Sequence, residues 1–156
     1  MSKTPWTQLW LDYQKVNSKG NEGYVSSVSL EGFEAEHPII KNALAELALG
    51  VKKMLGQEIS VKTGSTEQGL VIKKETTSPD LEGAYRLVEK SGKFTLLAGE
   101  ETGVLYGVFH VLRIIATEKS LQGVEEKKSP SQPLRMMNHW DNMDGSIERG
   151  YSGRSF

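Results

Sequence analysis

Apolar residues recur at helical spacing in two segments of the chain. In residues 36–55 they follow one another at steps of three and four: Ile40, Ala43, Leu44, Leu47, Val51, Met54 and Leu55. Pro38 suits a first helical turn, and Gly56 suits a C-terminal cap. In residues 101–118 the apolar face is broader and indicates deeper burial: Val104, Leu105, Val108, Phe109, Val111, Leu112 and Ile115. The pattern predicts two amphipathic helices.

Short alternating or β-branched runs surround the two helices and predict strands. These runs are residues 6–13, 24–30, 58–63, 70–74, 84–89 and 94–98. Ser91-Gly92 joins the last two runs in the manner of a hairpin turn. The pattern therefore predicts an α+β fold, in which a small mixed β-sheet carries two main helices.

Gly103 and Gly107 lie four residues apart on one face of the second predicted helix. Two glycines inside a helix cost roughly 1 kcal/mol each relative to Ala, so packing must offset that cost. The spacing predicts that this helix approaches the sheet closely. His110 lies on the same apolar helix, and we expect it to be a hydrogen-bonded histidine of the core.

Residues 125–133, EEKKSPSQP, are typical of a linker because they are charged, contain two prolines and have no apolar side chain. We place a domain boundary there, between an N-terminal α+β accessory domain at 1–128 and a second segment at 129–156. The second segment begins with apolar residues typical of a buried strand, which polar side chains follow or interrupt. Polar groups at the end of a strand are typical of a (β/α)8 barrel, but a barrel needs on the order of 250 residues. Only about two dozen residues follow the linker, so a complete barrel cannot be present.

Composition narrows the function classes. At 156 residues and 37% apolar content, the chain has the size of one soluble domain. Its net charge of -1 gives no bulk field that attracts nucleic acid or an anionic membrane. Without cysteine, and with three histidines, a structural zinc site is not expected, and no cofactor is predicted. The N-terminus lacks the apolar run of a signal peptide, so we expect a cytoplasmic protein without a membrane segment.

Two blocks carry a family resemblance. The segment NHWDNMDGSIERGYSGRS, residues 138–155, resembles the start of the catalytic barrel in glycoside hydrolase family 67, the α-glucuronidases. The segment GVLYGVFHVLR, residues 103–113, is similar to the last helix of that family's N-terminal domain. This second block also resembles the N-terminal domains of β-N-acetylhexosaminidases, which share a Gly-x-Tyr strand and a Tyr-Gly helix. In this chain those residues are Gly83, Tyr85, Tyr106 and Gly107. The NHWDN block favours the glucuronidases. The resemblance implies a hexosaminidase-like N-terminal domain, followed at 129–156 by a linker and the first strand and loop of a truncated catalytic (β/α)8 barrel.

The resemblance implies an enzyme of xylan degradation. Its reaction removes α-1,2-linked glucuronic acid, or the 4-O-methyl ether, from xylooligosaccharides with inversion. Inversion requires two carboxyl groups roughly 6.5–9.5 Å apart, and in the family both lie on later barrel strands. We therefore assign no catalytic residue to this chain and expect it to be inactive alone. The substrate-binding candidates are Trp140, Asp141, Asn142, Glu148 and Arg149.

Each candidate also has a structural interpretation. Trp140 can present its ring to a sugar or pack at the base of a barrel. Asp141, beside Asn142 and close to Gly145, is typical of a turn or cap, while Glu148 and Arg149 can form an ion pair at the rim of the pocket.

Two alternatives to a glucuronidase fragment stay open. The first is a free-standing carbohydrate-binding or interaction domain, and the second is the accessory domain of a hexosaminidase-like glycosidase. The partners that we expect are a xylooligosaccharide bearing glucuronic acid and the missing catalytic barrel, without nucleic acid or membrane. Oligomerisation stays open.

Overall fold

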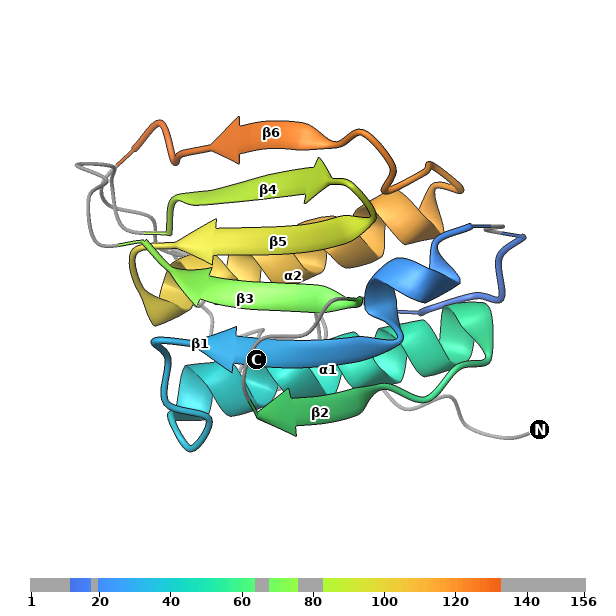
Figure 1. The fold of residues 1–156 in the computed structure, drawn as a ribbon, viewed down its shortest axis with the longest axis horizontal. Coiled ribbons are helices and arrows are strands. Elements are labelled where there is room, and N and C mark those ends of the chain that lie inside the picture. Colours follow the sequence, from blue (N-terminus) through green and yellow to red (C-terminus); the bar gives the residue numbers. More distant parts are fainter. Residues whose placement is uncertain (1–11, 18–19, 64–67, 76–82, 133–156) are drawn as a thin grey trace, which may run out of the picture.

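The computed structural model describes residues 12–17, 20–63, 68–75 and 83–132, in which one sheet carries helices on a single face (Figure 1). The elements in chain order are the 3-10 helix η2 (Glu22–Val25), β1 (Ser27–Glu31), α1 (Pro38–Leu55), β2 (Ser60–Thr63), β3 (Leu70–Lys74), β4 (Tyr85–Lys90), β5 (Lys93–Ala98), α2 (Glu101–Ala116) and β6 (Glu125–Lys128). Both α1 and α2 lie behind the sheet in Figure 1, so the opposite face carries no α-helix from the described residues. The predicted α+β class is confirmed.

The sheet is mixed, as its predicted class requires. Its strand order is β2-β1-β3-β5-β4-β6. The pairs β1–β2, β1–β3 and β3–β5 are parallel, whereas β4 runs antiparallel to both of its neighbours, β5 and β6. The helix α1 connects β1 with β2, because parallel neighbours need a crossover rather than a tight turn.

The hairpin predicted at Ser91-Gly92 is confirmed. Ser91 has φ 53° and Gly92 has φ 81°. Two consecutive positive φ angles are typical of a type I′ turn, whose twist matches that of the strands it joins. Lys90 and Lys93 therefore face each other as the last pair of the β4–β5 ladder.

The core lies between the sheet and the two helices. The buried strand residues that join this cluster are Val28, Leu70, Ile72, Leu87, Phe94, Leu96 and Ala98. The helices contribute Ile40, Ala43, Leu47, Val51, Met54, Val104, Val108, Val111, Leu112, Ile114 and Ile115. Burying one large apolar side chain stabilises the fold by about 1.5–3 kcal/mol, so this cluster is the main source of stability.

The helix ends follow the residues that predicted them. Pro38 begins α1, where its missing N–H removes no helical hydrogen bond. Gly56 caps the other end and donates its N–H to the carbonyl oxygen of Lys52. At the end of α2, the Thr117 hydroxyl donates to the carbonyl oxygens of Arg113 and Ile114.

The close approach predicted for α2 is also confirmed. A Cβ at position 107 would lie 2.2 Å from Leu96 Cδ1 of β5, so any side chain larger than hydrogen would require the Leu96 side chain to move. The two helices make a similar contact, because a Cβ at Gly50 of α1 would lie 2.6 Å from Leu112 Cδ2 of α2. These glycines bring the backbones of three elements together.

The linker prediction is wrong for its first four residues. Glu125–Lys128 form β6, an edge strand that pairs with β4 and continues the N-terminal domain. Its side chains are exposed or half-buried, so no apolar pattern marks it in the sequence. Charged side chains on an edge strand also protect it from pairing with other chains. Of the other predicted strands, residues 24–30 begin with η2, and most of residues 6–13 lie outside the described residues.

Candidate functional site

The substrate-binding residues predicted from the sequence lie outside the described residues. These are Trp140, Asp141, Asn142, Glu148 and Arg149, in a segment that follows residue 132. Their role in binding therefore stays a prediction. Two pockets of the described domain are candidate sites, one beside α2 and β6 and one on the helix-free face of the sheet.

The first pocket adjoins a polar cluster that joins three elements. The hydroxyl of Tyr85 on β4 lies 3.0 Å from Nδ1 of His110 on α2. The other ring nitrogen, Nε2, lies 3.7 Å from a carboxylate oxygen of Glu126 on β6. Lys128 Nζ lies 2.8 Å from that same oxygen. The expectation that His110 is a hydrogen-bonded core histidine is confirmed, since its side chain is 5% exposed.

The charges of this cluster follow from burial and from close partners. Burial lowers the pKa of His110; Glu126 opposes this change, and Arg113 and Lys128 add to it. The hydrogen bond from Lys128 lowers the pKa of Glu126 below its ordinary value, although burial opposes this. His110 is therefore neutral at pH 7 beside an ionised carboxylate. This arrangement favours the ring proton on Nε2, with the Tyr85 phenol donating to Nδ1.

The cluster opens onto a cavity of about 390 Å³. Its lining residues are His110, Arg113, Ile114, Thr117, Lys119 and Glu126. Glu126 is the one carboxylate among these lining residues, whereas hydrolysis of a glycosidic bond commonly uses a pair of carboxyl groups. The Tyr85–His110 contact connects α2 with β4 of the sheet, and the lining of this pocket holds one carboxylate rather than a pair.

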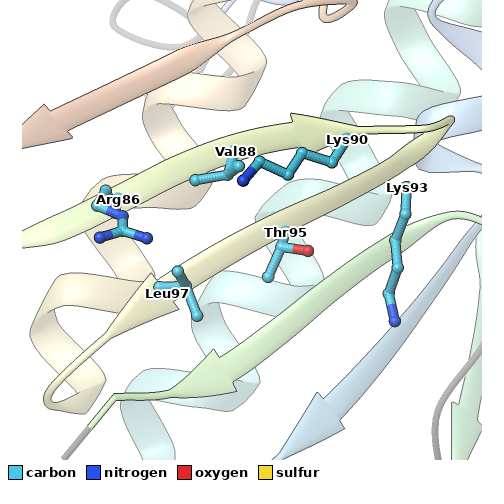
Figure 2. Close-up of a pocket in the computed structure, with 6 residues that line it drawn as sticks. All are labelled: Arg86, Val88, Lys90, Lys93, Thr95 and Leu97. Atoms are coloured by element: carbon cyan, nitrogen blue, oxygen red, sulfur yellow. The ribbon is translucent and has the colours of Figure 1, made fainter.

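The second pocket lies on the helix-free face of the sheet, across β4 and β5 (Figure 2). It is shallow, with a volume of about 160 Å³. Its lining residues are Arg86, Val88 and Lys90 of β4 and Lys93, Thr95 and Leu97 of β5. Three of these six residues are cationic and none is acidic, so the pocket suits an anion and has no group for general acid–base catalysis at neutral pH.

This basic pocket was not predicted, although the sequence contains a signal for it. Residues 86, 88 and 90 alternate with the buried Leu87, and residues 93, 95 and 97 alternate with the buried Phe94 and Leu96. Period-two alternation places each set on one face of its strand. The pairing of the two strands then brings the sets together.

In residues 12–17, 20–63, 68–75 and 83–132, no group of three His, Cys, Asp or Glu side chains could hold a metal ion. Across the same ranges, no helix combines the length and the apolar character that crossing a bilayer requires.

Comparisons with known proteins agree with the resemblance of the two sequence blocks. The model for the glycosyl hydrolase family 67 N-terminus matches residues 9–111, and the model for the family 67 middle domain matches residues 114–156. The α-glucuronidase of Hypocrea jecorina is 32% identical over 94% of this chain and 20% of its own length. The probable α-glucuronidase A of Aspergillus terreus is 33% identical over 74% of this chain and 15% of its own length.

A solved structure shares the fold at low sequence identity. It is a family GH115 4-O-methyl-α-glucuronidase with specificity for decorated arabinogalactans, with a TM-score of 0.53 and 16% identity. The match covers 69% of this chain and 18% of that one. The chain spans no more than about one fifth of the length of the two curated relatives described above. Because the N-terminal family model covers more than half of its residues, the chain belongs to glycosyl hydrolase family 67.

Proposed function

We propose that this chain is the N-terminal part of an α-glucuronidase. The enzyme removes α-1,2-linked glucuronic acid, or the 4-O-methyl ether, from xylooligosaccharides with inversion of configuration. The observation that carries this proposal is the ordered match to the N-terminal and middle-domain family models. The relatives support it, since one is an α-glucuronidase and the other a probable α-glucuronidase A. The matched region spans 15% and 20% of the lengths of those two relatives, which leaves room for a complete barrel.

The catalytic acid and base are proposed to lie in that barrel. An inverting glycosidase holds two carboxyl groups roughly 6.5–9.5 Å apart, with a water molecule between the second carboxylate and the sugar. Of the two pockets described above, one has a single carboxylate in its lining and the other has none. The domain therefore supports the barrel, and the 156-residue chain does not hydrolyse substrate by itself.

The terminal segment is proposed to contribute to the wall of the sugar pocket. Trp140 packs its ring on the apolar face of the uronic acid, while Asp141 and Asn142 supply hydrogen-bonding groups. Glu148 and Arg149 form an ion pair at the rim. These assignments rest on the family block at residues 138–155 and on the middle-domain match that contains it.

The experiment follows the reaction of a longer protein that joins this chain to its barrel. Aldouronic oligosaccharides are incubated with the enzyme, and proton NMR identifies the first anomer released. Inversion of an α-linkage gives β-glucuronic acid first, beside the unsubstituted xylooligosaccharide. Failure to release glucuronic acid contradicts the assigned substrate, and release of the α-anomer contradicts inversion.

A set of variants tests the proposed wall residues in the same protein. Trp140→Ala should raise KM, because it removes a sugar contact made in both the ground state and the transition state. Trp140→Phe keeps an aromatic ring and serves as the matched control. If Trp140→Ala changes neither KM nor kcat, residue 140 has no contact with the sugar.

A further inference from the structure

The helix-free face of the sheet carries three cationic side chains over two neighbouring strands. Arg86 and Lys90 lie on β4, and Lys93 lies on β5 (Figure 2). The strand register pairs Lys90 directly with Lys93 and Arg86 with Leu97. The cationic side chains therefore line one shallow pocket, whose third cross-strand pair is Val88 with Thr95.

These three cations have no acidic partner among the described residues, unlike other lysines of the domain. Lysines that form ion pairs with glutamates are Lys41, Lys52, Lys73, Lys74 and Lys128. The Lys73 pair is the closest comparison, because its partner Glu31 is its cross-strand neighbour on the next strand of the sheet. At β4–β5, the other residues of the pocket are Val88, Thr95 and Leu97, and none can neutralise a cation. The Nε atom of Arg86 is also buried without a hydrogen-bond partner.

This arrangement costs stability in the free protein. Like charges directly opposite each other on adjacent strands are destabilising, and Lys90 faces Lys93 in this way. An anion in the pocket relieves that repulsion. Carboxylates suit it because Arg and Lys form charge-assisted hydrogen bonds with carboxylate oxygens. The half-buried Val88 and Leu97 supply an apolar floor, and the Thr95 hydroxyl lies on the same surface.

We propose that this basic pocket binds the carboxylate groups of an acidic, uronate-bearing glycan. It would be a second, noncatalytic contact with the polymer, separate from the sugar pocket of the barrel. The choice of a uronate as the anion rests on the proposed function. Single-stranded nucleic acid fits the pocket less well, because its lining contains no aromatic side chain on which a base could stack.

Binding of the 156-residue chain to 4-O-methylglucuronoxylan oligosaccharides tests the proposal. Titration calorimetry at about 0.05 M ionic strength, where surface charges are weakly screened, should detect the complex. Unsubstituted xylooligosaccharides of the same length should bind at least about tenfold more weakly, because they lack carboxylates. Added salt should weaken the acidic complex and leave the neutral one unchanged.

Two triple variants distinguish binding at this pocket from an effect of net charge. Arg86→Gln, Lys90→Gln and Lys93→Gln together should weaken binding by about tenfold or more, because charge-assisted contacts are lost. Lys41→Gln, Lys52→Gln and Lys53→Gln remove the same charge from α1, which packs on the other face of the sheet (Figure 1). This control should bind within about twofold of the parent chain, since exposed charges far from the ligand are screened.

Several results overturn the proposal. They are absence of glucuronoxylan binding, equal losses in the two triple variants, and tighter binding of a single-stranded oligonucleotide of matched charge. If the pocket variant fails to fold, the proposal is tested by the amide chemical shifts of the parent chain, measured with and without the ligand. The ligand must then shift Thr95 and Leu97, and unmoved signals at both residues contradict the site. Because these measurements need no turnover, they can fail while the glucuronidase assay succeeds.

Discussion

Gly103 of α2 lies so close to Ala84 that a Cβ at position 103 would come within 2.4 Å of the Ala84 carbonyl oxygen. A backbone oxygen beside β4 cannot rotate away as a side chain can. Gly103→Ala should therefore destabilise the domain by about 1–3 kcal/mol through overpacking, despite the better helix propensity of Ala. Urea denaturation followed by circular dichroism measures the change.

The control for this change is Gly23→Ala in η2. A Cβ at position 23 would meet no atom within 4 Å. Its effect on the free energy of unfolding should stay within about 0.5 kcal/mol. Equal stabilities of Gly103→Ala and the parent chain would show that α2 does not approach the sheet as closely as described.

The β4–β5 turn supplies a second prediction, with two changes of opposite sign. Gly92 has φ 81°, and a Cβ there meets no atom within 4 Å, so Gly92→Ala tests backbone conformation alone. It should cost about 1–2 kcal/mol. Ser91 has φ 53°, in the left-handed region that Asn tolerates better than Ser. Ser91→Asn should therefore stabilise the fold by roughly a few tenths of a kcal/mol. Thermal unfolding of both variants checks the signs, and a stabilising Gly92→Ala would exclude this turn type.

The sequence allowed the helices and this hairpin to be predicted because their signals are local. Pro38, Gly56 and the apolar steps between them define α1, and Ser91-Gly92 defines a turn. The strand β6 could not be found in this way. It is held by backbone hydrogen bonds to β4, and its charged side chains follow no apolar alternation.

The strand order and the two pockets could not be predicted without the three-dimensional fold. No local pattern shows that β3 separates β1 from β5, because these are pairings between distant segments. The Tyr85–His110 contact arises where α2 crosses β4, 25 residues along the chain. The residues of the basic pocket alternate with buried residues along β4 and β5, which the sequence shows. That they line one pocket follows only from the pairing of the two strands. The predicted residues at 140–149 lie outside the described part of the chain and stay a hypothesis.

The contact between Tyr85 and His110 gives a third prediction. Tyr85→Phe removes the hydroxyl and leaves Nδ1 of a nearly buried imidazole without its partner. The loss should be about 1–2 kcal/mol of unfolding free energy. In a double-mutant cycle with His110→Leu, the coupling should be about 1 kcal/mol. Additive losses in the cycle would mean that the two side chains do not interact.

The carboxylate of Glu89 gives a fourth prediction, which concerns pH. Backbone N–H groups of Gly123 and Gly92 donate to its two oxygens at 2.8 Å. These bonds, Gly123 first, lower the pKa of Glu89 below its ordinary value of 4.5, although burial opposes them. The folded state therefore binds a proton less readily than the unfolded chain. The stabilisation is complete above pH 4.5 and is lost as pH falls through the lowered pKa.

Glu89→Gln measures this contribution. The parent chain should be more stable than the variant at pH 7, and the difference should shrink steadily below pH 4.5. Glu125→Gln removes the same charge from an exposed position of β6 and is the control. A stability difference between the parent and Glu89→Gln that does not change with pH would rule out the two backbone hydrogen bonds as its cause.

We propose that this chain carries the supporting domain of an α-glucuronidase and none of its catalytic carboxylates. Release of glucuronic acid from aldouronic oligosaccharides tests this most directly, with the purified chain and the longer, barrel-containing protein assayed side by side. We expect turnover by the longer protein and none by residues 1–156 at equal molar concentration. Turnover by the 156-residue chain that is abolished by Asp141→Asn or Glu148→Gln would contradict the claim, since a catalytic carboxylate would then lie within it.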